Sequence, residues 1–338
     1  MSLACILGCA GPVLGADEAA FFAQTASWGF ILFGRNIESP DQVRALTSAL
    51  REAVGRPDAP VLIDQEGGRV QRMGPPNWRA YPAARAYGQI EDPQSRRETV
   101  RLGARLMAHD LAQVGVNVDF MPVLDVPAPG ARDVIGDRAY GDGAQAAALL
   151  GRAAAEGLLA GGVLPVIKHI PGHGRAGADS HFSLPVVESA YEDLLARDFA
   201  PFAALSDMPM AMTAHVVYAA VDPRRPATTS RKVISQVIRG AIGFDGLLIS
   251  DDLSMQALAG TLAQRAGDAL DAGCDVVLHC NGDLAQMAAV AGASKPLAGR
   301  AAARAEAALA RLPRVAEPFD AVMASAQFDA AFAKRRAA

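Results

Sequence analysis

The chain has 338 residues, 51% of them hydrophobic, and a formal net charge of -4. It is long enough to bury a large core, and we expect one domain over residues 1–338, with a core of about 3–312 and a C-terminal extension at 313–338. The slightly acidic balance gives no basic field that would recruit nucleic acid. No apolar stretch reaches the ~20 residues that span a bilayer, so we expect no membrane partner.

The four cysteines are Cys5, Cys9, Cys274 and Cys280. Their spacings fit neither a zinc knuckle nor a redox CxxC motif, which predicts buried free thiols and a reducing cytoplasm. Only eight residues precede Cys9 and none is basic, which is too little for a secretory signal. The sequence therefore favours a soluble, cytoplasmic protein.

Apolar runs of strand length alternate with amphipathic segments along the chain. The predicted strands are Ala4–Cys9, Gly29–Phe33, Val61–Asp64, Val118–Pro122, Val163–Lys168, Pro209–Thr213, Gly246–Ser250 and Asp275–His279. The predicted helices between them are Asp17–Ser27, Pro40–Val54, Ser95–Val114, Ala144–Ala160, Tyr191–Leu205, Thr229–Ile242 and Met255–Ala272. Two further helical patterns, Asp283–Ala293 and Pro296–Ala310, are expected to cover the outside.

Eight β/α units predict an α/β fold of the closed (β/α)8 barrel type, because parallel strands need crossover helices and eight strands close a filled core. A doubly wound open sheet is the structural alternative, but no GxGxxG follows the first strand as a dinucleotide-binding version would require. Polar residues stand at or near the predicted strand ends, where barrel enzymes place their sites. They are Asp64, Asp119, Lys168, His169, His215, Asp251 and His279.

Five stretches carry candidate chemistry: residues 63–72 (IDQEGGRVQR), 134–141 (VIGDRAYG), 168–174 (KHIPGHG), 179–181 (DSH) and 250–255 (SDDLSM). In this order, with MTAHVVY at 212–218 and GRNIESPDQV at 34–43, they resemble the family 3 glycoside hydrolases. The nearest resemblance is to the single-domain bacterial β-N-acetylhexosaminidases of cell-wall recycling, and it covers nearly the whole chain. Ile170 stands where the family usually has Phe, a conservative hydrophobic exchange.

Asp251 resembles the family's catalytic nucleophile. A glycosidase that works through a covalent intermediate needs a carboxylate below the anomeric carbon and an acid above the leaving oxygen. Asp251 directly follows the apolar run GLLIS, so a rigid strand would aim it into the barrel mouth. Asp252 is expected to point aside or to cap the following helix.

The acid implied by the resemblance is His181, held by Asp179 on the glycine-rich loop. Positions i and i+2 of an extended segment lie on one side, so Asp179 can accept from one imidazole nitrogen while the other faces the leaving oxygen. An unperturbed imidazole pKa of ~6.5 suits a group that donates a proton and later takes one from water. His173 is expected to support the loop and not to act in catalysis.

The resemblance assigns sugar binding to Asp64, Arg72, Arg138, Lys168 and His169. Asp64 would accept from hydroxyls, while Lys168 and His169 would donate to them. Gly67 and Gly68 permit a tight turn that would bring Arg72 back over the pocket. Taken one at a time, each of these side chains could equally be a structural ion pair at a barrel rim.

The function implied is a retaining exo-β-N-acetylglucosaminidase that acts as a monomer without cofactor or metal. It would hydrolyse the terminal, non-reducing GlcNAc of muropeptide fragments that carry GlcNAc linked to 1,6-anhydro-N-acetylmuramic acid. A metal-dependent barrel hydrolase is the first alternative, since His169, His173, Asp179, His181 and Asp251 include zinc ligand types. A family 3 β-glucosidase or xylosidase and a sugar-binding module without catalysis are the others. Against the metal-dependent hydrolase, the first strand of this chain has no HxH motif to start a barrel metal site. A sugar-binding module without catalysis would need Asp251 or His181 replaced, and both are present.

Overall fold

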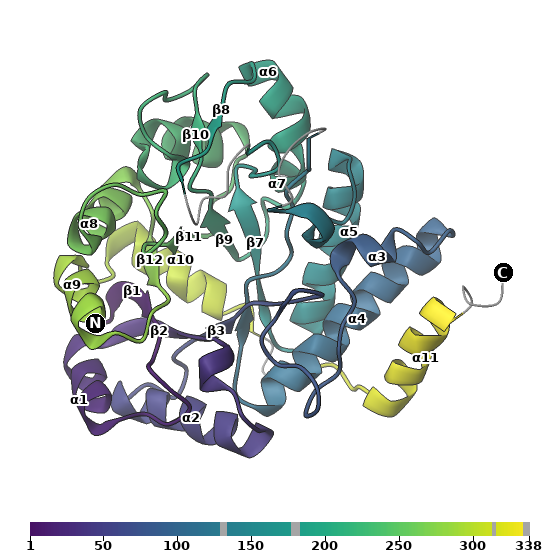
Figure 1. The fold of residues 1–338 in the computed structure, drawn as a ribbon, viewed down its shortest axis with the longest axis horizontal. Coiled ribbons are helices and arrows are strands. Elements are labelled where there is room, and N and C mark those ends of the chain that lie inside the picture. Colours follow the sequence, from purple (N-terminus) through teal and green to yellow (C-terminus); the bar gives the residue numbers. More distant parts are fainter. Residues whose placement is uncertain (129–133, 177–182, 313–315, 334–338) are drawn as a thin grey trace.

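The computed structural model describes residues 1–128, 134–176, 183–312 and 316–333. Eight parallel strands form a closed barrel in the order β1-β12-β11-β9-β7-β6-β3-β2 (Figure 1). Their bounds are β1 Leu3–Leu7, β2 Ser27–Leu32, β3 Val61–Ile63, β6 Val118–Asp119, β7 Leu164–Ile170, β9 Met210–Thr213, β11 Leu247–Asp252 and β12 Val276–His279. The predicted α/β barrel and its eight strands are confirmed.

Side chains fill the barrel, as in other (β/α)8 folds. Ile6, Phe120, Val166, Met210 and Ile249 belong to one fully buried interior cluster. A second, larger cluster lies between the strands and the surrounding helices and includes Leu7, Ile63 and Leu248. Neighbouring positions of one strand, such as Ile6 and Leu7, thus point to opposite faces and are both apolar, which is why these strands appear as continuous hydrophobic runs.

Helices surround the barrel. Those that match the prediction within a few residues are α1 Ala16–Thr25, α2 Pro40–Ala53, α4 Pro93–Gln113, α5 Ala144–Ala160 and α9 Leu284–Ala293. Ser39 and Asp92 cap α2 and α4, and in both helices proline occupies the first turn. A short helix, α3 Ala84–Tyr87, precedes α4.

Three predicted helices differ from the structure. The segment Tyr191–Leu205 is divided into α6 Tyr191–Asp193, a wide turn η3 Leu194–Asp198 and α7 Ala200–Ala204. Pro201 in this segment has no N–H for a helical bond, which favours the interruption. The helix predicted from Met255 begins later, as α8 Leu262–Ala272, where Thr261 and Gln264 form a capping box. The predicted helix Thr229–Ile242 contains a short η4, Ala227–Thr229, and then a wide helix η5, Val233–Ala241.

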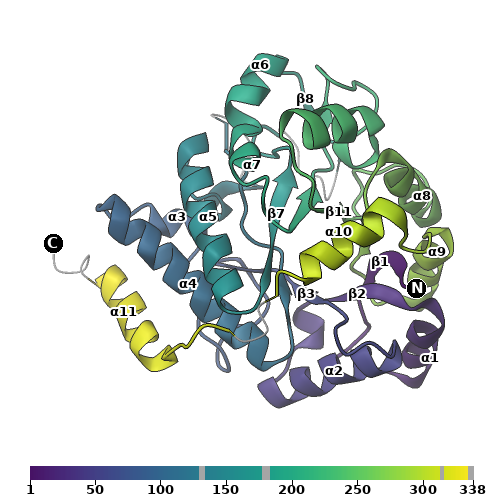
Figure 2. The same ribbon diagram turned by 180° about the vertical axis from the view of Figure 1, so that it is seen from behind.

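The last two described helices, α10 and α11, pack against different parts of the molecule. Helix α10, Gly299–Leu309, crosses one end of the barrel (Figure 2), where Ala305 and Ala308 join the interior cluster. Arg304 of α10 is bonded to Asp245 and Asp275, which precede β11 and β12, so α10 closes the amino-terminal end. Helix α11, Ala321–Ala333, was not predicted; it lies along α4 on the outside (Figures 1 and 2).

Two small sheets lie outside the barrel. Strands β4 Gln65–Gly67 and β5 Val70–Gln71 form an antiparallel hairpin, and β8 Val186–Val187 pairs with β10 Val217–Tyr218. The hairpin supplies the turn that was predicted at Gly67 and Gly68, both of which have positive φ (89° and 58°).

All four cysteines are buried and free, as predicted. Burial raises the pKa of Cys5 and Cys9 to about 12, so both are thiols and not thiolates at neutral pH. Within the described ranges, none of the helices combines the length and the apolar character needed to cross a bilayer.

Candidate active site

The carboxyl ends of the barrel strands bring the predicted polar side chains to one face. Asp64 directly follows β3, Lys168 and His169 lie near the end of β7, and Asp251 lies near the end of β11. Arg138 ends the short helix η2, Gly136–Arg138, and Arg72 follows the β4–β5 hairpin. Asp179 and His181 fall within 177–182 and so lie outside the described residues.

Lys168 is the centre of a buried ion-pair network. Its side chain is 2% exposed, and its Nζ lies 2.7 Å from Asp64 Oδ1 and 2.6 Å from Glu66 Oε1. Burial alone would raise the pKa of Asp64, but attraction to Lys168 and Arg72 and the hydrogen bond from Lys168 outweigh it and hold this pKa far below its usual range. The network is therefore charged at neutral pH.

The two predicted arginines approach the same network from different sides. Arg138 donates from Nε and Nη2 to both carboxylate oxygens of Glu66, each at 2.8 Å. Arg72 donates from Nη2 to Asp64 Oδ2 at 3.2 Å, and its guanidinium lies 4.8 Å from the centre of the Phe33 ring. The structure thus brings Asp64, Arg72, Arg138 and Lys168 together.

Asp251 is held by the backbone that follows it. Its Oδ1 accepts a hydrogen bond of 2.8 Å from the N–H of Asp252. Burial would raise the pKa of Asp251, but His215, His169, that N–H and Lys168 together lower it below the ordinary value. Asp251 is therefore an ionised carboxylate at neutral pH.

Asp252 points aside, as one of the two expectations had it, but it caps no helix. Its Oδ1 accepts from the N–H groups of Ser254 and Cys280, at 3.0 and 3.2 Å, and its Oδ2 accepts from the Ser254 hydroxyl at 2.5 Å. The helix that it might have capped starts only at Leu262. Asp252 instead ties the turn after β11 to the end of β12.

His215 contacts the backbone that follows Asp251. Its Nε2 donates to the carbonyl oxygen of Asp252 at 3.0 Å, and its Nδ1 lies 2.7 Å from Thr228 Oγ1. Burial lowers the pKa of His215, so the ring is neutral and Nδ1 accepts from the threonine hydroxyl. His215 therefore fixes the backbone next to Asp251.

His169 lies beside a carboxylate that the sequence did not single out. Its Nδ1 is 2.7 Å from Asp125 Oδ2, and its ring packs edge-on against His173 with 5.7 Å between the ring centres. Burial, followed by the charge of His169, lowers the pKa of His173 to about 4. A neutral, buried His173 agrees with the expected supporting position in the loop.

Glu66 and Asp125 are the two site residues that sequence reasoning missed. Glu66 stands inside the motif IDQEGGRVQR, but nothing in the spacing said that its side chain would meet Lys168 and Arg138. Asp125 follows Pro122 in the run PVLDV, beyond the predicted strand end. For Asp125 the available signal was one acidic residue in an otherwise apolar run, whereas Glu66 stands two residues after Asp64 in a motif that already carried a predicted site residue.

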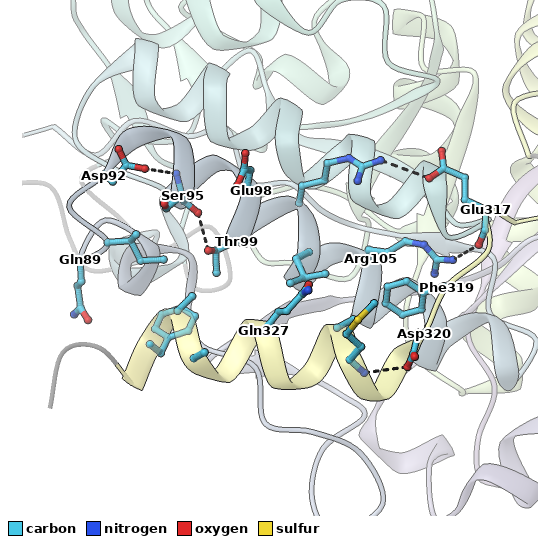
Figure 3. A pocket seen from close by; sticks show the side chains of 18 of the residues that line it. Gln89, Asp92, Ser95, Glu98, Thr99, Arg105, Glu317, Phe319, Asp320 and Gln327 are labelled. Carbon is cyan, nitrogen blue, oxygen red and sulfur yellow. Dashed lines mark hydrogen bonds and ion pairs between the residues drawn. The ribbon is translucent and has the colours of Figure 1, made fainter. Parts of the chain in front are cut away.

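Among the described residues, no group of three or more His, Cys, Asp or Glu side chains is arranged to hold a metal ion. A cavity of about 1140 Å³ lies away from the strand ends, between α4 and α11 (Figure 3). Arg105, Glu317 and Phe319 line one end of it and Gln89 the other. None of the predicted site residues that the structure describes lines this cavity.

The chain is similar to known proteins over most of its length. The family described as "Glycosyl hydrolase family 3 N terminal domain" matches residues 15–315. A β-hexosaminidase of Methylococcus capsulatus is 42% identical over 275 residues, which cover 80% of each chain, and one of Pseudomonas aeruginosa is 40% identical over 279 residues, 82% of each.

The solved structure of NagZ from Neisseria gonorrhoeae in complex with N-trifluoroacetyl-D-glucosamine superposes with a TM-score of 0.84. It is 34% identical, and the match covers 98% of this chain and 97% of that one. The chain therefore belongs to glycoside hydrolase family 3 and, within that family, to the β-hexosaminidases.

Proposed function

We propose that the protein is a retaining exo-β-N-acetylglucosaminidase that removes a terminal, non-reducing GlcNAc from peptidoglycan fragments. The substrate we propose is GlcNAc linked to 1,6-anhydro-N-acetylmuramic acid peptides. The enzyme would act in the cytoplasm as a monomer, with no metal or other cofactor. Membership in the β-hexosaminidases supports the reaction type, and the complex of the gonococcal relative with a glucosamine derivative supports the sugar.

The observation that carries the mechanism is an ionised Asp251 at the strand ends, within the field of Lys168 and His169. In the first step the Asp251 carboxylate attacks the anomeric carbon and the bond to the leaving oxygen breaks, while His181 gives that oxygen a proton. In the second step His181 takes a proton from water, whose oxygen attacks the anomeric carbon and releases Asp251. Asp179 would orient His181 and stabilise its cationic form.

The sugar would be held by Asp64, Arg72, Arg138, Lys168 and His169. Lys168 and Arg138 are already paired with carboxylates, so they are oriented before the sugar arrives. Their remaining N–H groups can donate to hydroxyl and acetamido oxygens, while Asp64 can accept from hydroxyls. Preformed contacts of this kind lower the entropy cost of binding.

The test is a chromogenic aryl β-GlcNAc assayed with wild type, Asp251→Ala and His181→Ala. We expect the Asp251 variant to lose at least ~10³-fold in kcat, as removal of a covalent nucleophile does. His181→Ala should lose less with a good leaving group, since the proton is then less needed. Activity that survives in Asp251→Ala would contradict the assignment.

Two further measurements define the class. Proton NMR of the first sugar released should show the β anomer, because a double displacement retains configuration. Aryl β-glucoside and β-xyloside, assayed side by side, should be much poorer substrates. Faster turnover of either one would move the protein to the glucosidase or xylosidase branch.

A further inference from the structure

Asp125 is a fully buried carboxylate at the edge of the candidate active site, with 0% of its surface exposed. The backbone after β6 runs beside β7, because the N–H of Val166 donates to Met121 and the N–H of Leu124 donates to Lys168, at 3.1 and 2.7 Å. This pairing brings Asp125 next to His169. The pairing of this segment with β7 thus sets the position of Asp125.

The Asp125 carboxylate accepts three hydrogen bonds, all from two residues. Its Oδ1 accepts from the backbone N–H of His173 at 2.6 Å and of His169 at 3.2 Å. Its Oδ2 accepts from Nδ1 of His169 at 2.7 Å. Burial would raise the pKa of Asp125, but electrostatic attraction to the His169 imidazole and these bonds lower it, so the group is an anion.

This arrangement determines which ring nitrogen of His169 is available. A carboxylate only accepts, so the Nδ1 facing it must carry a proton. Nε2 is then the ring nitrogen left for a ligand. The two backbone bonds fix the main chain on both sides of the ring, and the edge contact with His173 limits its rotation.

We propose that Asp125 is a positioning residue for the glycosidase reaction: it holds His169 in the Nδ1–H form and presents Nε2 to the sugar. The proposal rests on the proposed role of His169 in sugar binding. Asp125 contacts no substrate and acts through the imidazole, as carboxylates do for histidines that bind metals or act as bases. A purely structural Asp125, which only joins the two backbone segments, is the alternative.

A double-mutant cycle separates these two cases. Asp125→Asn keeps the size and one acceptor oxygen but removes the charge and faces Nδ1 with an amide. We expect kcat/KM for aryl GlcNAc to fall by about 10–100-fold, the usual effect of removing such a supporting carboxylate. In the His169→Ala background the same substitution should change kcat/KM by less than about twofold, because residues that act as one unit are not additive. Full additivity would overturn the proposal.

The imidazole can also be observed directly. In long-range ¹H–¹⁵N spectra, the wild-type His169 signal, assigned by its loss in His169→Ala, should show a protonated Nδ1. In Asp125→Asn the proton distribution between Nδ1 and Nε2 should change. An unprotonated Nδ1 in the wild type, or an unchanged spectrum in the variant, would refute the proposal even if the variant folded poorly or the protein cleaved no GlcNAc glycoside.

Asp275→Asn is the matched control. Asp275 is also a buried carboxylate with three hydrogen bonds, from Arg239, Arg304 and the N–H of Leu248, but it lies at the amino-terminal end of the barrel. We expect this variant to lose stability while keeping kcat/KM and the His169 spectrum of the wild type. A wild type without activity on GlcNAc would refute the proposed function, whereas the spectra test the contact between Asp125 and His169 independently of that activity.

Discussion

Glu66 and Arg138 meet through two parallel hydrogen bonds of 2.8 Å, and the same carboxylate lies 2.6 Å from Nζ of Lys168. One acidic side chain, 5% exposed, therefore holds two of the proposed sugar-binding cations. Burial would raise the pKa of Glu66, but Lys168 and Arg138 lower it. A buried carboxylate between two cations stabilises the charges on both, so its removal should affect binding and stability together.

Glu66→Gln should lower the free energy of unfolding by about 3 kcal/mol, because it leaves two buried cations with one carboxylate. KM for aryl GlcNAc should rise, since Arg138 and Lys168 lose their orientation. The folded-state pKa of Glu66 is lowered, so its contribution is present above the unfolded value of ~4.3 and is lost as pH falls. Urea unfolding measured between pH 7 and pH 3 should therefore show that the difference in free energy of unfolding between the wild type and Glu66→Gln becomes smaller as the pH falls.

The control is Glu156→Gln, which breaks the half-exposed pair between Glu156 and Arg97. Such surface pairs contribute about 0–1 kcal/mol, so the free energy of unfolding should change little at every pH. Equal losses in the two variants would show that the network around Lys168 contributes no more than a surface pair.

Asp119→Asn should be tolerated at neutral pH. Burial raises the pKa of Asp119 well above its ordinary value, although the N–H of Gln65 and the charge of Lys168 oppose this. A carboxyl with a raised folded-state pKa makes the protein lose stability as pH rises from the unfolded value of ~3.9 through the folded one. The asparagine keeps the acceptor for Gln65 and removes that loss.

Urea unfolding at pH 4.5, 7 and 8.5 measures this effect. We expect the Asp119 variant to be at least as stable as the wild type at pH 7 and to lose its advantage towards pH 4. A variant that is less stable by more than about 1 kcal/mol at pH 7, a typical cost of a lost hydrogen bond, would mean that Asp119 is ionised in the fold.

Gly174→Ala should damage the segment that follows β7. A Cβ at Gly174 would lie 2.0 Å from the carbonyl oxygen of Val126, and this neighbour is backbone that cannot rotate away. Overpacking of this kind typically costs about 1–3 kcal/mol. We expect a lower thermal midpoint and a lower kcat/KM, because the segment carrying His169 and His173 is displaced.

Gly267→Ala is the corresponding control. Gly267 lies inside α8, and a Cβ there would meet no atom within 4 Å. The replacement should stabilise the helix by about 0.5–1 kcal/mol and leave kcat/KM unchanged. If Gly174→Ala behaved in the same way, residues 172–176 would have to shift freely against residues 125–128.

Removal of metal should not change the activity, since neither step of the proposed mechanism uses one. Dialysis against a chelator, followed by assay with and without added zinc, checks this. Loss of activity that zinc restores would favour the metal-dependent hydrolase instead of the retaining glycosidase.

The eight barrel strands could be predicted because strands buried on both faces are apolar at every position, as at Ile6 and Leu7. The end of the barrel that carries the candidate site could also be predicted, since Asp64, Lys168 and Asp251 come at or near the carboxyl ends of strands. The side chains that contact these residues could not be predicted from the sequence. The contact of Glu66 with Arg138 depends on how the β4–β5 hairpin meets η2, and that of Asp125 with His169 on how the segment after β6 aligns with β7; no local pattern records either.

The predicted ends of helices are wrong where tertiary contacts determine where the helix begins. Residues 253–260 have an apolar pattern, but the side chain of Asp252 and the guanidinium of Arg265 satisfy their backbone groups in a turn. Helix α11 escaped prediction because its buried side, Ala324 and Phe328, is narrow. Phe328 packs where Gly103 of α4 has no side chain, a fit visible only in three dimensions.

The closure of the barrel links residues from the two ends of the chain. The N–H of Ala4 donates to Lys295, and the N–H of Leu297 donates to Ser2, beside the pairing of β1 with β12. During synthesis β1 emerges long before β12, yet one of its edges has no partner until β12 and residues 295–297 have left the ribosome. The nascent protein must keep an apolar strand edge from pairing wrongly until almost the entire barrel has been translated.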